Sequence, residues 1–281
     1  MSSILEDFYR SKEIFIKLPT GGKWYKNKPY LSVTNEIGIM PMTTKDEMIL
    51  KIPDSLYNGE ALFTVIKSVA PDIKDPYEVS LPDVDAILIA TRAVTQGKDM
   101  NVSVTCPNCN EIGDYSIDIP SLLSKIRPIE EDIEIEIKKL KLKLKPNTLS
   151  IITASSIESV EVSRIKKSVT ELEAKGEFEK SNNALHESLN RIAAANLAII
   201  ADMIESVTTP NGDVVTDYQE ILKWIKNLDL KSTEKIKSAG EPLNISGIPR
   251  VHKFTCGNEL CNHTYEATVE FNPTFFFTPS L

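Results

Sequence analysis

The sequence predicts an α+β fold with a helical N-terminal part, a small β module closed by distant segments of the chain, and an inserted helical region. Two observations predict this class. Apolar residues recur at helical spacing within residues 43–96 and again within residues 146–239. At residues 100–119, and again after Gly240, apolar and polar residues alternate as they do in strands.

Composition and charge exclude several classes of protein. The chain has 281 residues, 41% of them hydrophobic, which suffices for a core and suggests about two domains. No apolar run reaches the roughly 20 residues that cross a bilayer, and the start lacks the basic and apolar regions of a signal peptide. We therefore expect no membrane association and a cytoplasmic location. The net charge of -8 has the wrong overall sign for wrapping nucleic acid.

The N-terminal part, residues 1–99, begins with β-like segments. A turn-rich loop, Leu-Pro-Thr-Gly-Gly, occupies residues 18–22. Two short segments, residues 31–33 and residues 37–39, then alternate apolar and polar side chains, so we expect short strands there.

Three helices are expected in the rest of this part. The first should begin at an N-cap and bury an apolar stripe, with these residues: Thr43 or Thr44 as the cap, and Met48, Ile49 and Ile52 as the stripe. The second covers residues 59–69 and the third residues 82–96. Asp83 and Asp85, near the start of the third helix, are interpreted as partners of the helix dipole rather than as paired catalytic carboxylates.

Residues 100–145 predict a hairpin followed by two more β segments. Residues 100–119 form the hairpin, with Cys106-Pro-Asn-Cys109 at its tip. Residues 133–137 and 140–144 also alternate, and the parity switches at the Lys-Lys pair between them. A second hairpin there would place glutamates opposite lysines, but Lys-Lys is poor turn chemistry. A single long strand with a bulge fits nearly as well.

Residues 146–245 predict an inserted helical domain. A first helix should run to about residue 175, and a second should cover residues 183–207. A tight turn at residues 210–213 precedes a short helix, and Ile236 lies on another helix. The second helix could offer a face to a partner, but core packing is the favoured interpretation.

Residues 246–281 predict a second hairpin and an aromatic tail. Cys256 and Cys261 lie at the tip of the hairpin, and residues 275–277 are three successive phenylalanines. Side chains alternate along a strand, so the three cannot all face one side. The tail either folds back onto this chain or docks into another protein.

The four cysteines predict a structural metal site. They are all the cysteines of the chain, and they fall in two closely spaced pairs at predicted hairpin tips: Cys106 with Cys109, and Cys256 with Cys261. A tetrahedral zinc ion takes four such ligands, and two facing turns of this kind make a zinc ribbon. The β module is then zinc-ribbon-like, with zinc tying together the two ends of the inserted region. Four cysteine ligands leave no open position for catalysis.

Other interpretations of the cysteines stay open. The second pair has four intervening residues instead of two, so His252 or His263 could replace a cysteine ligand. A redox-active Cys-x-x-Cys pair is disfavoured, because such pairs open a helix after a strand and here a β segment follows. Disulfides are disfavoured in a chain without a secretion signal.

Two other classes of function remain to be compared. An enzyme is disfavoured because the sequence lacks phosphate-binding glycine motifs and a nucleophile motif, and its three histidines offer few catalytic arrangements. No small-molecule substrate is therefore expected. The alternative function is a zinc-ribbon accessory protein that binds nucleic acid. It requires basic residues near the cysteine turns, but acidic and basic residues are mixed there.

The order of these features resembles a known family. The features are Leu-Pro-Thr-Gly-Gly at residues 18–22 with Tyr25, the helix at residues 44–50, the stretch from residues 81–85 to Arg92 and Gly97, the Cys-Pro-Asn-Cys turn, a helical middle, a second cysteine pair and a terminal Phe-Phe. Together they resemble the baseplate hub assembly proteins of contractile-tailed bacteriophages of the T-even type. The resemblance spans most of the chain and is best over residues 14–119.

This resemblance implies a non-enzymatic role in building the central hub of the tail baseplate. The partners would be other phage baseplate hub proteins, and the location would be the cytoplasm of the infected host bacterium. Whether the protein stays in the virion tail baseplate or leaves it as an assembly chaperone is open. The loop at residues 18–25 and the phenylalanines at residues 275–277 are the expected contact surfaces, chosen for their exposure chemistry.

Overall fold

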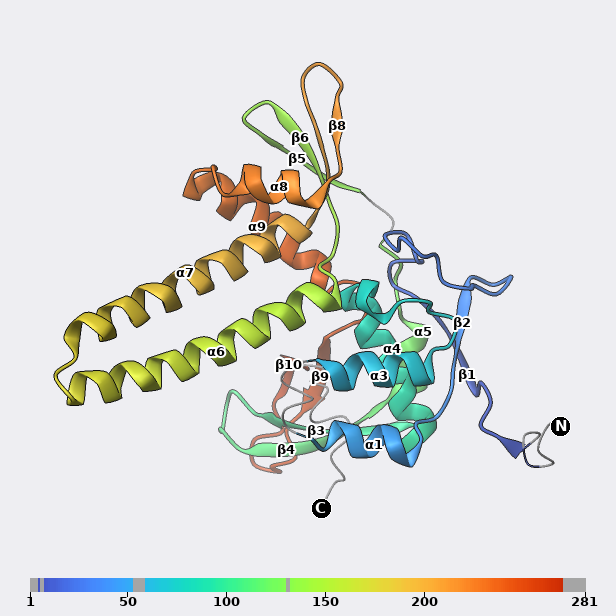
Figure 1. Ribbon diagram of the computed structural model, residues 1–281. Helices are drawn as coiled ribbons and strands as arrows, with labels where there is room; N and C mark the ends of the chain where they lie inside the picture. Colours follow the sequence, from blue (N-terminus) through green and yellow to red (C-terminus); the bar gives the residue numbers. More distant parts are fainter. Residues whose placement is uncertain (1–4, 6–7, 53–58, 130–131, 270–281) are drawn as a thin grey trace.

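Two hydrophobic clusters organise the chain in the computed structural model (Figure 1), which describes residue 5 and residues 8–52, 59–129 and 132–269. The first cluster joins residues 16–122 to Leu149 and to residues 248–269, and the second lies within residues 137–243. The fold is mixed α+β, as predicted. The expected aromatic tail, residues 275–277, lies outside the described residues. Within the described residues, no helix combines the length and apolarity that a bilayer crossing requires.

The N-terminal part consists of a strand pair and helices: β1 (Ile14–Lys17), β2 (Glu36–Ile39), α1 (Thr44–Leu50), α3 (Glu60–Val69), the 3-10 helix η2 (Pro76–Glu78) and α4 (Leu81–Gln96). All three predicted helices are confirmed. The strand expected at residues 31–33 is wrong, because Val33 lies fully exposed in a turn. The stripe expected on α1 is confirmed only at Ile49, which packs against the first cluster. Met48 is 63% exposed, and the helix buries Leu50 and Asp46 instead.

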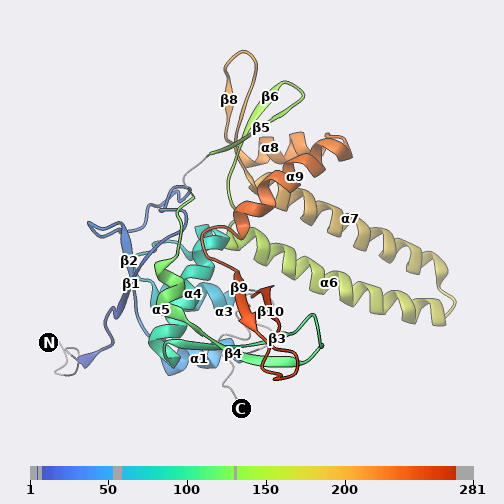
Figure 2. The same ribbon diagram turned by 180° about the vertical axis from the view of Figure 1, so that it is seen from behind.

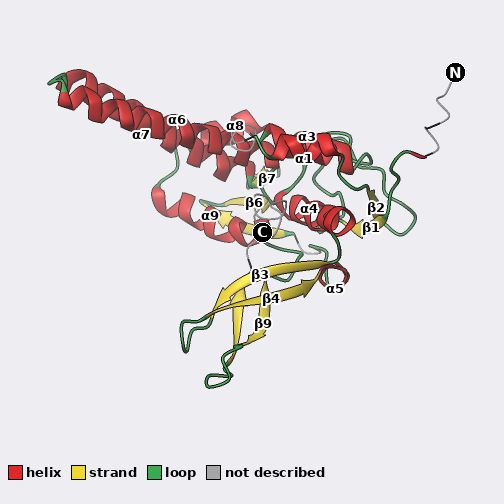
Figure 3. Ribbon diagram, turned by 90° about the horizontal axis from the view of Figure 1, so that it is seen from below, coloured by secondary structure: helices red, strands yellow, loops and turns green. Residues whose placement is uncertain are grey.

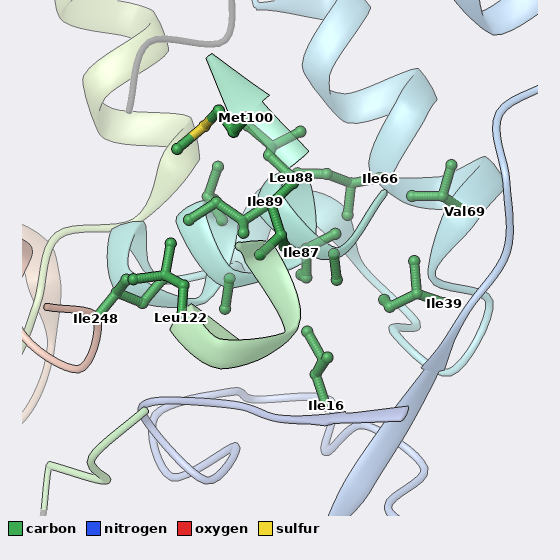
Figure 4. Packing of buried hydrophobic residues seen from close by; sticks show 14 of the residues in the cluster. Ile16, Ile39, Ile66, Val69, Ile87, Leu88, Ile89, Met100, Leu122 and Ile248 are labelled. Carbon is green, nitrogen blue, oxygen red and sulfur yellow. The ribbon is translucent and has the colours of Figure 1, made fainter. Parts of the chain in front are cut away.

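Helix α4 is the centre of the first cluster. Its residues 86–90 are all fully buried, and a helix that is apolar all round belongs in a core. Figure 4 shows Ile16 and Ile39 from the strand pair and Ile66 from α3 gathered around it. The packing fixes the N-terminal end of α4, where Asp83 and Asp85 lie.

The β module consists of two antiparallel hairpins and a short helix: β3 (Asp99–Thr105), β4 (Ile112–Asp118), α5 (Ile119–Ser124), β9 (Val251–Thr255) and β10 (Thr264–Thr268). Figure 3 shows both hairpins on one side of the helical layer. The predicted hairpin at residues 100–119 is confirmed. A module closed by distant segments is also confirmed, because the two hairpins share the first hydrophobic cluster.

The inserted region combines helices with a four-stranded antiparallel sheet, ordered β5-β6-β7-β8. Its elements are β5 (Ile133–Ile137), β6 (Leu140–Leu144), α6 (Leu149–Ala174), α7 (Phe178–Asp202), β7 (Ile204–Thr208), β8 (Val214–Val215), α8 (Tyr218–Ile225) and α9 (Leu230–Asn244). β5 and β6, grouped with the first cysteine hairpin in the sequence analysis, pack here in the second cluster.

The structure decides between the alternatives for residues 133–144. β5 and β6 form a hairpin, which places Glu136 opposite Lys141, and the bulged-strand alternative is wrong. The expected helix over residues 183–207 ends early, at Asp202, and β7 follows it. The apolar residues of β7 pair with β6 and pack in the second cluster, and a short apolar run does not distinguish a strand from a helix.

Helices α6 and α7 form a long antiparallel hairpin that projects from the rest of the molecule (Figures 1 and 2). We call it the helical arm. The end of the arm near the body is packed, with Leu149 and Ile200 buried. Further out, these large apolar side chains are exposed: Ile157, Phe178, Leu185 and Leu189. Core packing, the favoured interpretation of the second helix, therefore applies to its body end.

Candidate metal centre

Two similar turns position the four thiols. The first lies between β3 and β4, and the second between β9 and β10. In each turn the second cysteine is followed by an asparagine with positive φ, 59° for Asn110 and 42° for Asn262. Asparagine adopts this left-handed conformation more readily than most residues. The backbone N–H groups of these asparagines then donate back into their own turns, to Cys106 and Asn258 respectively.

The distances between the thiols fit a tetrahedral metal site. All four Sγ atoms lie within 4.8 Å of one another. The Sγ atoms of Cys106 and Cys261 are 3.9 Å apart, and those of Cys109 and Cys256 are 3.5 Å apart. Zinc–sulfur bonds of about 2.3 Å in a tetrahedron place the sulfurs about 3.8 Å apart. A disulfide requires about 2.05 Å, so the cluster has the spacing of metal ligands. The four cysteines could therefore bind a metal ion.

The surroundings of the cluster favour a thiolate at Cys261, whereas desolvation contributes to a raised pKa at Cys109 and at Cys256. Cys106 and Cys256 are buried, whereas Cys109 is exposed and Cys261 is partly exposed. The Asn108 side-chain amide donates to Cys261 Sγ at 3.3 Å, and this hydrogen bond lowers the pKa of Cys261 to about 7. Across the hairpins, Asn258 donates to Glu111 at 2.7 Å. Such outer contacts orient and tune metal ligands.

Both candidate substitute histidines lie outside the thiol group. The group of described residues that could hold an ion contains the four cysteines and neither histidine. His252 Nε2 lies 3.1 Å from the carbonyl oxygen of Pro249. The His263 ring stacks on Tyr265, with ring centroids 6.1 Å apart. The wider spacing of the second cysteine pair is thus compatible with a four-sulfur set.

A buried carboxylate, for which the sequence predicts only an interaction with the helix dipole, lies at the start of α4. Asp83 is fully buried and accepts hydrogen bonds from the Thr20 backbone N–H at 2.9 Å, from the Thr20 hydroxyl, and from the Tyr25 hydroxyl at 2.8 Å. Desolvation raises the pKa of Asp83 to about 6, and these hydrogen bonds oppose the rise. Asp83 therefore anchors a loop, which the dipole interpretation missed. No sequence signal links residue 20 to residue 83.

The loop at residues 18–25, which is expected from the sequence to be a contact surface, is largely buried in the structure. Leu18, Thr20 and Tyr25 are each buried to 4% exposure or less. They pack against the same chain, so these three side chains are not exposed for contact with a partner. Lys23 and the partly exposed Trp24 are what the loop presents outward.

Asp85, the other acidic residue near the start of α4, has a different partner. It pairs with Arg250, just before β9. Desolvation raises the pKa of Asp85 to about 7, although the arginine opposes this rise. Asp83 and Asp85 thus hold separate segments against α4. Arg250 is engaged in this pair rather than contributing to a basic surface beside the cysteine turns.

The comparisons with known proteins give one family. The family model described as T4 bacteriophage base plate protein matches residues 11–277. Neither the curated proteins nor the solved structures gave a match. The matched residues include all four cysteines, α4 and the whole inserted region, and they cover nearly the whole chain. The chain therefore belongs to the T4 bacteriophage base plate protein family.

Proposed function

We propose that this baseplate protein acts in assembly of the baseplate hub, through contacts with other hub proteins and without catalysis. The observation that carries the proposal is the family match over residues 11–277. Among the features quoted for the hub assembly proteins, the described residues include the largely buried loop at residues 18–25 and the Cys-Pro-Asn-Cys turn. The proposed location is the host cytoplasm during assembly and, for a retained subunit, the virion tail baseplate.

The helical arm supports a role in protein contacts. It is a two-helix hairpin, and two helices alone leave part of each apolar face without cover. Phe178 is 65% exposed and Leu189 is 53% exposed. Large apolar side chains grouped on a projecting element are typical of surfaces that bind other proteins.

We further propose that the four cysteines hold a structural zinc ion. Cys106 and Cys109 come from the hairpin β3-β4, and Cys256 and Cys261 from the hairpin β9-β10. A metal ion there would join the chain before the inserted region to the chain after it. With four thiolates bound, zinc has no free position for a substrate, so the proposed role is structural.

Quantitative mass spectrometry tests the hub role. Mature phage particles and unassembled hub intermediates are purified from the same infection, and the copy number of this chain is measured in both. We expect it in the hub intermediates. Presence in finished particles at a fixed copy number would identify a structural subunit, and loss on maturation would identify an assembly chaperone. Absence from both would overturn the proposal.

Metal analysis tests the zinc site. We expect one zinc ion per chain in the purified protein and loss of that zinc in Cys106→Ser and Cys256→Ser, because each variant removes a buried ligand. His252→Gln and His263→Gln are the matched controls, and both should retain the metal. Zinc retention by the cysteine variants, or loss in a histidine variant, would overturn the proposed ligand set.

A further inference from the structure

A groove lies between the two hairpins of the β module, and none of the four cysteines is in its lining. Its volume is about 550 Å³, and it is lined by β4, α5 and β9. β4 is hydrogen-bonded to β3 and β9 to β10, and the two hairpins form separate two-stranded sheets. The groove is therefore bordered by two sheet edges. Figure 3 shows β4 and β9 as neighbours on the same side of the molecule.

The register of each hairpin fixes which peptide groups face outward. Cys106 donates to Glu111, and Ile119 to Lys98, so the odd-numbered residues of β4 face β3 and Ser116 faces away. Cys256 donates to His263, and Val269 to Arg250, so Lys253 of β9 faces away from β10. Ser116 and Lys253 both line the groove. Within the described chain, no recorded backbone hydrogen bond joins β4 to β9.

The two strands are held near each other by side chains instead. The Tyr115 hydroxyl donates to the outward-facing carbonyl oxygen of Thr255 at 3.1 Å. The rings of Tyr115 and Phe254 also pack, with centroids 4.7 Å apart. This contact fixes the spacing of the edges without occupying the peptide groups of Ser116 and Lys253. Unpaired strand edges of this kind are ready templates for another strand.

The charges along the groove favour an acidic occupant. Lys125 and Lys253 are exposed, and neither has a salt bridge among the described residues. His252 adds a third basic side chain. The one acidic residue in the lining, Asp118, already accepts a hydrogen bond from the Ser121 backbone N–H at 2.8 Å as the N-cap of α5. The groove is thus basic in a chain whose net charge is -8.

We propose that this groove binds an extended, acidic segment of a partner protein as an added β-strand. The segment would pair with the free edge of β4 or β9, and its carboxylates would lie near Lys125 and Lys253. Main-chain hydrogen bonds give affinity in this mode of recognition, and side-chain contacts give specificity. The inference rests on the proposed function in taking the partner to be a baseplate protein, and it adds the surface and the chemistry of the contact.

Hydrogen exchange on the full-length protein tests the inference. The probe is a short synthetic peptide of alternating glutamate and valine, and the readout is amide exchange at Ser116 and Lys253. We expect the peptide to slow exchange at one or both of these amides. Reversing two exposed charges in Lys125→Glu with Lys253→Glu should weaken binding by about tenfold or more. Lys98→Glu, at an exposed lysine of the same module outside the groove, is the matched control.

Three control experiments distinguish strand addition by an acidic segment from other ways of binding. An N-methylated version of the peptide lacks backbone donors and should not bind, and a lysine-valine peptide should not bind either. Equal binding by either peptide, or unchanged exchange at both amides, would overturn the inference. Ser116→Pro removes an outward N–H without removing a bond to β3, which edge strands tolerate. If the free protein were a dimer that this variant dissociates, the occupant would be a second copy and the acidic partner would be wrong. If the peptide did not bind but the chain were present in hub intermediates, the proposed strand binding would be wrong and the proposed hub function would still hold.

Discussion

Asp83 shows how a single buried side chain connects distant parts of the chain. Its carboxylate receives three hydrogen bonds from the loop at residues 18–25, and each fixes that loop against the start of α4. The cost is desolvation, which raises the pKa of the carboxyl from 3.8 to about 6. Between these two values the folded chain holds a proton that the unfolded chain has lost. The free energy of unfolding therefore falls as the pH rises through this window.

We predict that Asp83→Asn removes this pH dependence. The wild type should lose about 2 kcal/mol of stability through this group between pH 4 and pH 7, since one unit of pKa corresponds to about 1.4 kcal/mol and the unfolded chain is already partly protonated at pH 4. The variant has lost hydrogen bonds, but its side chain does not titrate. Its stability relative to wild type should consequently rise by about that amount over the same range. Urea unfolding at a series of pH values measures both curves.

The matched control is Asp118→Asn, which removes an exposed carboxylate that caps a helix. It should change stability by only a few tenths of a kcal/mol, because asparagine caps a helix about as well as aspartate does, and leave the pH profile parallel to that of the wild type. Parallel curves for Asp83→Asn and the wild type would contradict the raised pKa of Asp83.

The cysteines and Asp83 differ in what the sequence could predict. The spacing of the four cysteines in the sequence predicts one group of metal ligands, and the structure brings their Sγ atoms within 4.8 Å of one another. Asp83 was interpreted from its position in a helix. Its partners Thr20 and Tyr25 come from a loop far away in the sequence, and no local pattern encodes that contact.

The turn between β5 and β6 has an unfavourable backbone conformation, which lowers the stability of this hairpin. Lys138 and Lys139 have φ values of 50° and 71°, a left-handed conformation that is unfavourable for residues with a Cβ atom. The pairing of the strands and the burial of Leu142 and Leu144 outweigh that cost. Lys138 also forms a salt bridge with Asp229, at 2.8 Å between Nζ and Oδ2.

We predict that Lys139→Gly stabilises the protein by about 1 kcal/mol, because glycine adopts positive φ without the steric cost. The substitution keeps the Lys138 salt bridge. Thermal or urea unfolding measures the change in stability. Lys141→Gly, two residues later in β6, is the contrasting variant and should be destabilising, since its backbone is extended and paired. Equal effects of the two substitutions would contradict the explanation from φ.

The elements that the sequence predicted least well are those whose pairing is nonlocal. Leu185 to Ile200 continue a helical pattern, and nothing in the apolar residues after Asp202 marks a change to a strand. β7 exists because it pairs with β6 on one side and β8 on the other. The choice between a hairpin and a bulged strand at residues 133–144 was likewise left open, because the turn residues and the strand pattern pointed in opposite directions.

At the scale of the whole molecule, the chain enters and leaves the inserted region side by side, because the Arg127 backbone N–H donates to the Gly247 carbonyl oxygen at 2.8 Å. Within the region, a second contact joins the segment after β6 to the end of α9. Asn147 and Asn244 are hydrogen-bonded through both the Asn147 backbone N–H, at 2.7 Å, and their side chains, at 2.8 Å. Asn147 is fully buried and also donates to Ile199 and Asp202 of α7. Adjacent ends are what an insertion into another fold requires. The thiols belong to the first hydrophobic cluster, whereas the sheet of the inserted region belongs to the second.

This separation predicts a local response to metal removal. Zinc binding and folding are coupled where the ligands come from separate segments, and here both cysteine hairpins belong to the first cluster while the sheet β5-β6-β7-β8 belongs to the second. A chelator should therefore accelerate amide exchange in β3, β4, β9 and β10 by about tenfold or more, and leave β5 to β7 nearly unchanged. The buried core around α4 should respond less than the hairpins, because it has its own packing.

Hydrogen exchange with and without chelator measures this, and the Cys256→Ser variant, already lacking metal, should show the faster exchange in both conditions. Equal acceleration across both clusters would contradict this prediction of a local response.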